Sequence, residues 1–395
     1  MATERLYYTD PTLVEFEGRI IHTCREGGQF KTALDRSAFY PTSGGQSCDT
    51  GSLAGLAVID VVESEDGDVI HVTAAEPGVV GARVRGLIDQ SRRWRNRQMH
   101  TAQHILSQTF IKLLGIETVS VHLGEEYGAI ELSTAEIDSK QIEQAELLAA
   151  EIIAANMPVD TRLLLPEEAA GLPLRKAPDR EGLIRVIQIG EFDWSACGGT
   201  HCSRTAEVGV LKIIGVEKTR GRVLVRFLSG VQAIADYQQR FCATDQLSRT
   251  LSCGIPDLAP RIDKLQAENK ELRKQTVELL KELTPVRAEA LAGRAERFGR
   301  VPVLIDVYSD VDTAPQLAKE VAGRIHGLAV FIADDKVLIA VSDDAGLHAG
   351  NIAKEFASRA GLRGGGGPKA AQVGGADPSR IVEYGSFIRE IVAHA

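Results

Sequence analysis

The chain has 395 residues, 44% of them hydrophobic and 25% charged, which is the composition of an ordinary globular protein. This length allows two or three domains, and no apolar run reaches the roughly 18 residues expected of a membrane-spanning helix. The net charge of −9 argues against nucleic-acid binding over the whole surface, although it leaves room for a local basic face.

The N-terminus and the cysteines favour a cytoplasmic setting. The first ten residues, MATERLYYTD, contain no apolar segment of the kind that secretory signals carry. In a chain of this length the six cysteines do not form a disulfide framework. In a reducing compartment, closely spaced cysteines indicate metal binding or catalysis instead.

Residues 1–90 predict an all-β domain. Short alternating apolar segments are separated by glycines, and four of them predict strands: VEFEGRII, FKTALD, AVIDVV and DVIHVT. We expect these strands to form a barrel or a sandwich. The segment SGGQSCDTG, from Ser43 to Gly51, lies between two of them and predicts a glycine-rich loop.

Residues 91–250 predict an α+β domain. Helix-forming residues run from Asp89 to Leu114, and a second amphipathic helix is expected from Ser139 to Ala155. The apolar runs LIRVIQI, GVLKIIGVE and RVLVRFL then predict strands around a loop that contains CGGTHC. The apolar face of the first helix consists of Met99, Ile105, Leu106 and Phe110.

Residues 251–298 predict a helical linker whose regular pattern ends at Pro285. Its roughly three heptads are marginal for an isolated coiled coil. The segment therefore favours either a homodimer through residues 262–283 or a hairpin within one chain, formed with Val286 to Phe298. The heptad positions, spaced alternately by three and four, are Ile262, Leu265, Asn269, Leu272, Thr276, Leu279 and Leu283.

Residues 299–395 alternate between strands and helices, which predicts a small α/β domain. VPVLIDVY, LAVFIA and KVLIAVS predict strands, and PQLAKEVAGRI and NIAKEFASRAG predict helices. RGGGGPKAAQVGG predicts a glycine-rich loop. Its backbone N–H groups could bind a phosphate, or the loop could be a flexible surface segment. The glycines concerned are Gly364, Gly365, Gly366 and Gly367.

The strongest chemical signal is HTAQH, His100 to His104, together with CGGTH, Cys197 to His201. Two histidines four residues apart project from one face of a helix, and the glycines of the second motif let a cysteine and a histidine converge. Mixed imidazole and thiolate ligands favour zinc. The alternative for the histidine pair alone is two unrelated surface residues. Cys202 either replaces a ligand or packs as a small buried thiol.

The chemistry of this site favours a hydrolase other than a peptidase. The helix lacks the glutamate of the His-Glu-x-x-His proteases, which serves them as a general base. Hydrolysis of an activated ester needs less assistance, since a metal can polarise the carbonyl or activate a water. If all four ligands bind at once, the site is closed and resembles a structural zinc site.

These motifs resemble the editing domain shared by alanyl-tRNA synthetases and the AlaX proteins. The resemblance rests on HTAQHIL followed by IGEFDWSACGGTHCSRTAEVG, and upstream on LDRSAFYPTSGGQSCDTGSL. Downstream, RGGGGPKAAQVGG is similar to the C-terminal loop of the DHHA1 domain of those synthetases. The similarity extends over nearly the whole chain in the same order, as in the long form of the AlaX family.

The resemblance implies an α+β fold in four parts. These are an N-terminal β-barrel (1–90), an α+β editing domain (91–250), a helical linker (251–298) and a DHHA1-like domain (299–395). It implies zinc as cofactor, with four ligands. It also places the glycine-rich segment and His122 at the substrate pocket, although His122 could equally be a half-exposed strand residue. The implied ligands are His100, His104, Cys197 and His201, and the implied substrate-binding residues are Ser43, Gly44, Gly45, Gln46 and His122.

The tRNA is expected to lie along two segments. A basic stretch precedes the first histidine and includes Trp94, so it could hold phosphates while the aromatic ring stacks on a base. The alternative is a solvated helix face with Trp94 in the core. The glycine run is the second segment, since the DHHA1 domain is implicated in tRNA binding. The basic residues are Arg92, Arg93, Arg95 and Arg97.

Together these features predict a trans-editing hydrolase that deacylates mischarged alanine tRNA, chiefly Ser-tRNA(Ala). Because the chain begins directly with the predicted barrel, we expect no aminoacylation activity. Two alternatives are a non-catalytic, zinc-stabilised tRNA-binding protein and an editing factor for another tRNA, such as threonine tRNA. Selection of serine over alanine would have to come from the serine hydroxyl, because alanine is the smaller side chain.

Overall fold

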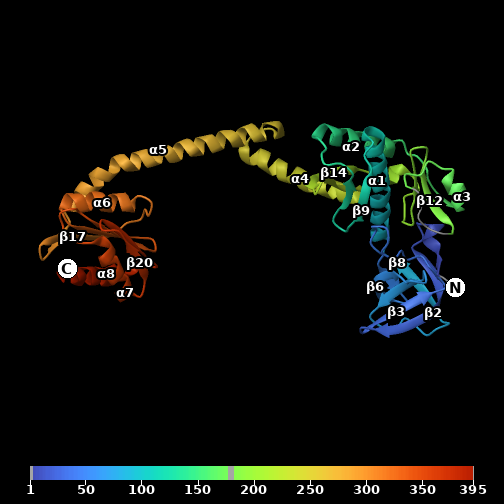
Figure 1. Ribbon diagram of the computed structural model, residues 1–395, viewed down its shortest axis with the longest axis horizontal. Coiled ribbons are helices and arrows are strands. Elements are labelled where there is room, and N and C mark those ends of the chain that lie inside the picture. The colour runs from blue at the N-terminus through green and yellow to red at the C-terminus, as the bar shows by residue number, and fades with distance from the viewer. Residues whose placement is uncertain (1–2, 177–181, 395) are drawn as a thin grey trace. The chain divides into compact units, whose positions relative to one another are not determined.

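The computed structural model describes residues 3–176 and 182–394 and divides the chain into two compact units, Met1–Leu247 and Ser248–Ala395 (Figure 1). Each unit has its own buried apolar clusters. The predicted α+β class, with a β-barrel first and a DHHA1-like domain last, is confirmed. Among the helices described, none is long and apolar enough to cross a membrane.

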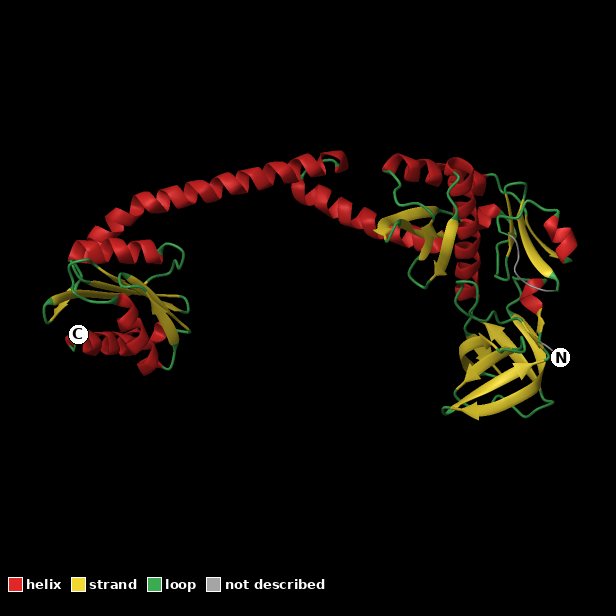
Figure 2. Cartoon of the chain, in the orientation of Figure 1, coloured by secondary structure: helices red, strands yellow, loops and turns green. Residues whose placement is uncertain are grey.

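The first unit begins with a closed six-stranded barrel (Figure 2). Buried and exposed residues alternate along two of its strands, because successive side chains of a strand point to opposite faces. Phe16, Ile20 and Leu34 are among the side chains that fill it. Around the barrel the strands are β2 (Glu15–Glu26), β3 (Gln29–Leu34), β7 (Val69–Thr73), β6 (Leu56–Glu63), β5 (Gly51–Leu53) and β8 (Arg83–Ile88).

Two very short strands precede and follow the start of the barrel. β1 (Glu4–Arg5) pairs in parallel with β4 (Arg36–Ser37), so that the N-terminal segment lies against the barrel. A single 3-10 turn, η1 (Leu6–Tyr8), follows β1.

A long buried helix, α1 (Gln90–Leu114), organises the rest of the first unit. Asp89 caps its N-terminus by accepting from the N–H groups of Ser91 and Arg92, and Gly115 ends it with a φ of 66°. The predicted apolar face of α1 packs against a four-stranded sheet and against α2 (Ser139–Ala154). In order, that sheet is β14 (Leu211–Thr219), β15 (Arg222–Ser229), β10 (Gly128–Leu132) and β9 (Thr118–Leu123).

A second, three-stranded sheet completes this part of the unit. Its middle strand, β12, pairs antiparallel with both neighbours. The strands are β11 (Val159–Leu164), β12 (Ile184–Ile189) and β13 (Asp193–Ala196), with α3 (Pro166–Ala170) beside them and the 3-10 turn η2 (Thr205–Val208) after them.

Two helices occupy the predicted linker region and the residues before it. α4 (Gly230–Leu251) was not predicted, and the 3-10 turn η3 (Ile255–Asp257) precedes α5 (Leu258–Ala292). The predicted pattern ended at Pro285, but α5 continues through it, because Ala288 in the following turn is completely buried in the core of the second unit. The predicted hairpin of residues 262–283 with Val286 to Phe298 is therefore wrong.

The second unit is a six-stranded mixed sheet covered by helices on both faces (Figure 1). Alternate residues of its central strands face α6 (Ala314–Ile325) on one side and α7 (Ala349–Ala360) with α8 (Ile381–Ala393) on the other. The 3-10 turn η4 (Pro378–Arg380) leads into α8. In order, the sheet is β16 (Glu296–Phe298), β17 (Val301–Val307), β18 (Leu328–Ala333), β19 (Lys336–Val341), β21 (Ala370–Gly374) and β20 (Arg363–Gly366).

Candidate metal centre

Four side chains from two parts of the first unit meet at one point. His100 and His104 project from α1 about one turn apart, while Cys197 and His201 lie in the loop after β13. Their ligand atoms all lie within 4.8 Å of one another. The structure thus brings together the four residues that the sequence predicts as ligands, in an arrangement that could hold a metal ion.

The spacing of these atoms fits a tetrahedral ion. Cys197 Sγ lies 3.4 Å from His100 Nε2 and 3.4 Å from His201 Nε2. Bonds of about 2.3 Å to sulfur and about 2.0 Å to nitrogen would separate two such ligands by about 3.5 Å in a tetrahedral zinc site. Cys202, the ambiguous cysteine of the motif, is outside the cluster and is buried in the apolar core of the unit.

Each histidine is held through its second ring nitrogen, which leaves Nε2 to face the cluster. Partners of this kind fix the orientation of the ring and the position of its proton in metal sites. The partners of the three imidazoles are a carboxylate, a side-chain amide and a hydroxyl. The three contacts are His104 Nδ1 to Asp193 Oδ2 (3.2 Å), His100 Nδ1 to Gln46 Oε1 (2.8 Å) and His201 Nδ1 to Thr101 Oγ1 (3.2 Å).

The electrostatic setting favours the protonation states that metal ligands require. Burial, together with the charges of Arg185 and Arg175, lowers the pKa of His100 to about 3. Burial, followed by the charges of His100 and His104 and then of these arginines, lowers the pKa of His201 well below its ordinary value. Burial by itself raises the pKa of the Cys197 thiol, but His104, the Gly199 N–H and Arg185 outweigh it and bring that pKa below its ordinary value. His100 and His201 are therefore neutral, and Cys197 readily forms a thiolate.

The glycine-rich segment forms a tight turn beside the cluster. Ser43 and Gln46 pair across it, with Gly44 at a φ of 55° and Gly45 at 84°, values that favour glycine. Gln46 is 1% exposed, and its side-chain amide contacts both α1 and the loop that carries Cys197 and His201. Its Oε1 lies beside His100, as described, and accepts from the N–H of Thr200 at 3.1 Å, while its Nε2 donates to the Thr200 hydroxyl at 3.0 Å.

A cleft of about 790 Å³ opens onto the cluster. Three of the four candidate ligands, His100, His104 and Cys197, reach its surface. Ser43 and Gly44 line it, as predicted for the substrate pocket, whereas Gly45 and Gln46 are not among its lining residues. A substrate in this cleft would therefore meet the cluster directly.

Strand β9 also lines the cleft, but not through the residue that the sequence predicts. Val119 and Val121 face the cleft, whereas His122 is exposed and does not line it. Successive side chains of a strand point to opposite faces, so His122 points away from the face that carries Val119 and Val121. The strand was identified correctly, and the placement of His122 in the pocket is wrong.

The predicted tRNA-binding role of Arg93 is also wrong. Its side chain is buried and forms an ion pair of 2.6 Å with the completely buried Asp49. It donates as well to the backbone carbonyls of Pro11 and Ala38. This guanidinium joins α1 to the barrel, and its burial keeps it from a phosphate in solution.

Arg97 is likewise structural, so its predicted contact with tRNA needs the same correction. It is 4% exposed, donates from Nε to the His201 carbonyl and pairs with Glu207 at 3.2 Å. Its guanidinium lies 5.2 Å from the centre of the Trp94 ring. Arg92 and Arg95 are partly exposed, although Arg92 pairs with Glu125. Their contact with tRNA remains a prediction.

The glycine run of the second unit is a strand rather than the predicted loop. Gly364, Gly365 and Gly366 belong to β20, which pairs antiparallel with β21 at the edge of the sheet. The carbonyls of Gly367 and Pro368 accept from the first N–H groups of α7. Alternate N–H groups of an edge strand point away from its partner, so contact of these glycines with phosphate remains a prediction.

Several residues of the site escaped the sequence analysis. Asp193, which orients His104, precedes Cys197 by four residues in FDWSACGG, and an acid so close to a ligand was an available signal. Arg185 donates to the carbonyls of Cys197 and Gly199 at 2.8 Å each and fixes the ligand loop. No local pattern marks Arg185, because its partners are brought to it by the pairing of β12 with β13.

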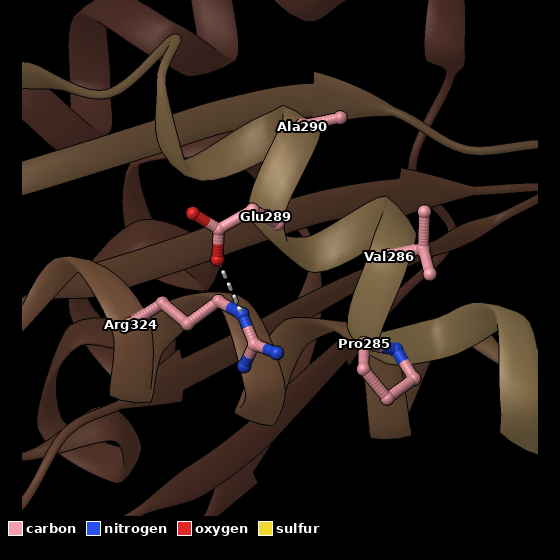
Figure 3. Close-up of a pocket in the computed structure, with 5 residues that line it drawn as sticks. All are labelled: Pro285, Val286, Glu289, Ala290 and Arg324. Carbon is pink, nitrogen blue, oxygen red and sulfur yellow. Dashed lines mark ion pairs between the residues drawn. The ribbon is translucent and has the colours of Figure 1, made fainter.

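A second pocket, of about 550 Å³, lies between α5 and α6 in the second unit (Figure 3). Arg324 pairs there with Glu289 at 3.3 Å, and Pro285, Val286 and Ala290 supply the remaining, apolar surface. The Glu289 side chain is 80% exposed, so this ion pair contributes little. The pocket has none of the converging ligands found in the cleft.

Comparison with known proteins identifies two domains. Residues 184–227 match the second additional domain of threonyl- and alanyl-tRNA synthetases, and residues 301–394 match the DHHA1 domain. The first of these regions runs from β12 to β15 and therefore contains Cys197 and His201.

Relatives match over almost the whole chain. An alanyl-tRNA editing protein, AlaX-L, of Pyrococcus horikoshii is 30% identical and covers 92% of this chain and 92% of its own length. An alanine–tRNA ligase of Archaeoglobus fulgidus is 33% identical over 94% of this chain, which spans only 42% of that ligase. Among solved structures, the C-Ala domain of Aquifex aeolicus alanyl-tRNA synthetase is similar over 25% of the chain and 97% of that domain, with 22% identity and a TM-score of 0.22.

Proposed function

Since this chain belongs to the family of the alanyl-tRNA editing protein AlaX-L, we propose that it is a zinc-dependent deacylase of mischarged alanine tRNA in the cytoplasm. Its main substrate would be Ser-tRNA(Ala). The observation that carries the proposal is the cluster of three histidines and one cysteine at the surface of the cleft. A zinc ion held there would supply an electrophile for the ester carbonyl.

The residues around the cluster prepare the site for an ester. Gln46, Thr101 and Asp193 hold the three imidazoles, so the ligand atoms need little rearrangement. Arg185 fixes the backbone on both sides of Gly198. Pre-positioned groups lower the barrier to reaction because the entropy of ordering them is lost during folding and not in the reaction step.

Selection of serine is supported by polar side chains next to the histidines. Gln103 and Thr118 line the cleft and both bond to Ser107, each at 2.8 Å, while Ser43 lies on the glycine-rich turn. A site that bonds a substrate hydroxyl leaves polar groups unpaired when alanine or glycine replaces serine. We therefore expect Ser-tRNA(Ala) to be hydrolysed faster than Ala-tRNA(Ala) or Gly-tRNA(Ala).

The number of candidate ligands favours one alternative. Four protein ligands are typical of structural zinc sites, whereas catalytic sites usually keep one position open. A zinc-stabilised tRNA-binding protein without activity would have this arrangement. Cys197, the candidate ligand that is only partly buried, is where a catalytic site would have to open.

The test compares deacylation by the wild type, Cys197→Ala and Cys202→Ala. Both cysteines lie in one loop, but only Cys197 belongs to the cluster. Cys197→Ala should lose zinc and at least about a hundredfold of the deacylation rate on Ser-tRNA(Ala), since the loss of even an outer partner of a ligand typically costs about 10–100-fold. Cys202→Ala should keep both and lose about 1 kcal/mol of stability through its small cavity.

Each alternative gives a different result. Active wild-type protein without zinc in elemental analysis would end the metal proposal. Zinc without hydrolysis of any ester would identify the binding protein, and faster hydrolysis of Ser-tRNA(Thr) than of Ser-tRNA(Ala) would identify editing of threonine tRNA.

A further inference from the structure

The N-terminal segment, which carried no sequence prediction, forms one wall of the cleft. The guanidinium carbon of Arg5 lies 5.6 Å, and that of Arg185 5.0 Å, from the centre of the Tyr8 ring. The Tyr8 hydroxyl accepts from Arg5 at 3.1 Å, and a Cβ placed on Gly198 would lie 3.5 Å from that hydroxyl. Gly198 follows the ligand Cys197, so the wall adjoins the metal centre. We name Arg5, Tyr8, Arg175 and Arg185 the cationic wall.

The cleft is cationic although the chain is acidic. Among the residues that the structure describes, four basic ones line it against two acidic ones, while the chain has 54 acidic and 45 basic residues. The acids that line the cleft are Glu63 and Glu117. A local excess of positive charge in a concave surface attracts anionic ligands.

Arg185 is a buried cation beside the ligand loop. This residue is 6% exposed, and its buried Nε has no hydrogen-bond partner among the residues described. Within the same residues it forms no ion pair, and its guanidinium donates only to carbonyls at the ligand loop and, weakly, to a hydroxyl. A buried cation without a carboxylate is costly, and a bound anion would offset that cost.

The neighbouring cations differ in how readily an anion can compete for them. Arg175 is held at 2.7 Å by the completely buried Asp193. Arg5 pairs with Glu63, whose side chain is 34% exposed, and partly exposed pairs of this kind are weak. Arg5 is therefore the cation of the wall that a ligand can most readily recruit.

We propose that the cationic wall binds the phosphodiester nearest the scissile ester, at the 3′ end of the tRNA. This rests on the proposed function, in which the ester attached to the terminal ribose lies at the metal centre. Arg5 contacts the phosphate in exchange for Glu63, and Arg185 contributes charge from beneath Tyr8. The wall recognises the sugar–phosphate backbone, so it holds the ester in register whatever amino acid is attached.

The experiment measures binding of the dinucleoside monophosphate CpA and of adenosine by calorimetry, using the full chain with its metal. Arg5→Gln should weaken CpA binding about tenfold, the loss expected for one charge-assisted contact, without changing zinc content or adenosine binding. Arg5→Lys should restore most of the affinity. Arg36→Gln is the matched control, because Arg36 lies in β4 beside β1 and pairs with Glu4 outside the cleft.

Glu63→Gln gives a result that loss of folding cannot imitate. Removing the acid that competes with the phosphate should tighten CpA binding, by up to about fivefold. Equal affinity of wild type, Arg5→Gln and Glu63→Gln for CpA would overturn the proposal even if Ser-tRNA(Ala) is deacylated. Because CpA carries no aminoacyl ester, the predicted changes in its binding would support the wall even in a protein without deacylase activity.

Discussion

Two glycine-rich segments with similar composition adopt opposite structures. Ser43–Gln46 is a two-residue turn whose glycines have positive φ values. The run from Gly364 to Gly366 is an extended edge strand. Glycine at the first site provides a backbone conformation, and at the second it allows close approach, since a Cβ on Gly364 would lie 2.4 Å from Val373 Cγ2.

The difference follows from what surrounds each segment. The turn is fixed by Gln46, whose buried amide bonds to both arms of the candidate metal centre. The strand is fixed by pairing with β21, and no cluster of candidate metal ligands lies there among the residues described. The number of glycines therefore does not distinguish the two segments. What distinguishes the turn beside the candidate metal centre from the edge strand is the buried polar side chain of Gln46.

The largest effect on metal affinity should come from Gln46→Ala. Loss of the amide leaves His100 Nδ1 and the Thr200 hydroxyl without their partner, and removal of such outer groups typically costs about 10–100-fold in metal affinity. Competition with a chelator measures this. Gln372→Ala, on the exposed face opposite the glycine run, is the control and should leave zinc affinity unchanged. If the two variants resisted the chelator equally, Gln46 and its turn would not contribute to metal affinity.

Local patterns were sufficient for much of the fold and for the ligands. Helix α1 has its cap, apolar face and two histidines within one segment, and the barrel strands alternate visibly. Contacts between distant residues were not predictable in this way. Arg93 looks like its neighbours in sequence, but Asp49, 44 residues earlier, buries it. Val121 and His122 can be told apart only once the face of β9 is known.

The same limit explains the error at the linker and the residues that were missed at the N-terminus. A proline interrupts the hydrogen bonds of a helix, yet α5 continues past Pro285 because Ala288 packs in the second unit's core. Arg5 and Tyr8 reach the cleft through the pairing of β1 with β4 and lie beside Arg185, 177 residues after Tyr8. No periodicity in the sequence encodes that approach.

On the free energy of unfolding, the largest effect is expected from substitution in the turn itself. Gly45→Ala places a Cβ 2.7 Å from the Val121 carbonyl oxygen at a φ of 84°, and we expect a loss of about 3 kcal/mol from clash and strain together. Gly44→Ala meets no atom within 4 Å and should lose only about 1 kcal/mol, from its φ of 55°. Urea unfolding measures both. A smaller loss for Gly45→Ala than for Gly44→Ala would show that contact with β9 does not constrain the turn.

The smallest effects should come from the glycine run, where a matched pair separates packing from function. A Cβ on Gly364 would lie less than 3 Å from Val373 and from the Gln372 carbonyl oxygen, so Gly364→Ala should lose about 2 kcal/mol of stability. A Cβ on Gly365 meets no atom within 4 Å, so Gly365→Ala should change stability by less than about 0.5 kcal/mol. Because neither change removes a donor or a charge, tRNA affinity at fixed salt should be unchanged for Gly365→Ala. A tenfold loss of tRNA affinity in stable Gly365→Ala would instead mean that tRNA approaches this strand too closely for a methyl group. The run would then resemble the turn in function as well as in composition.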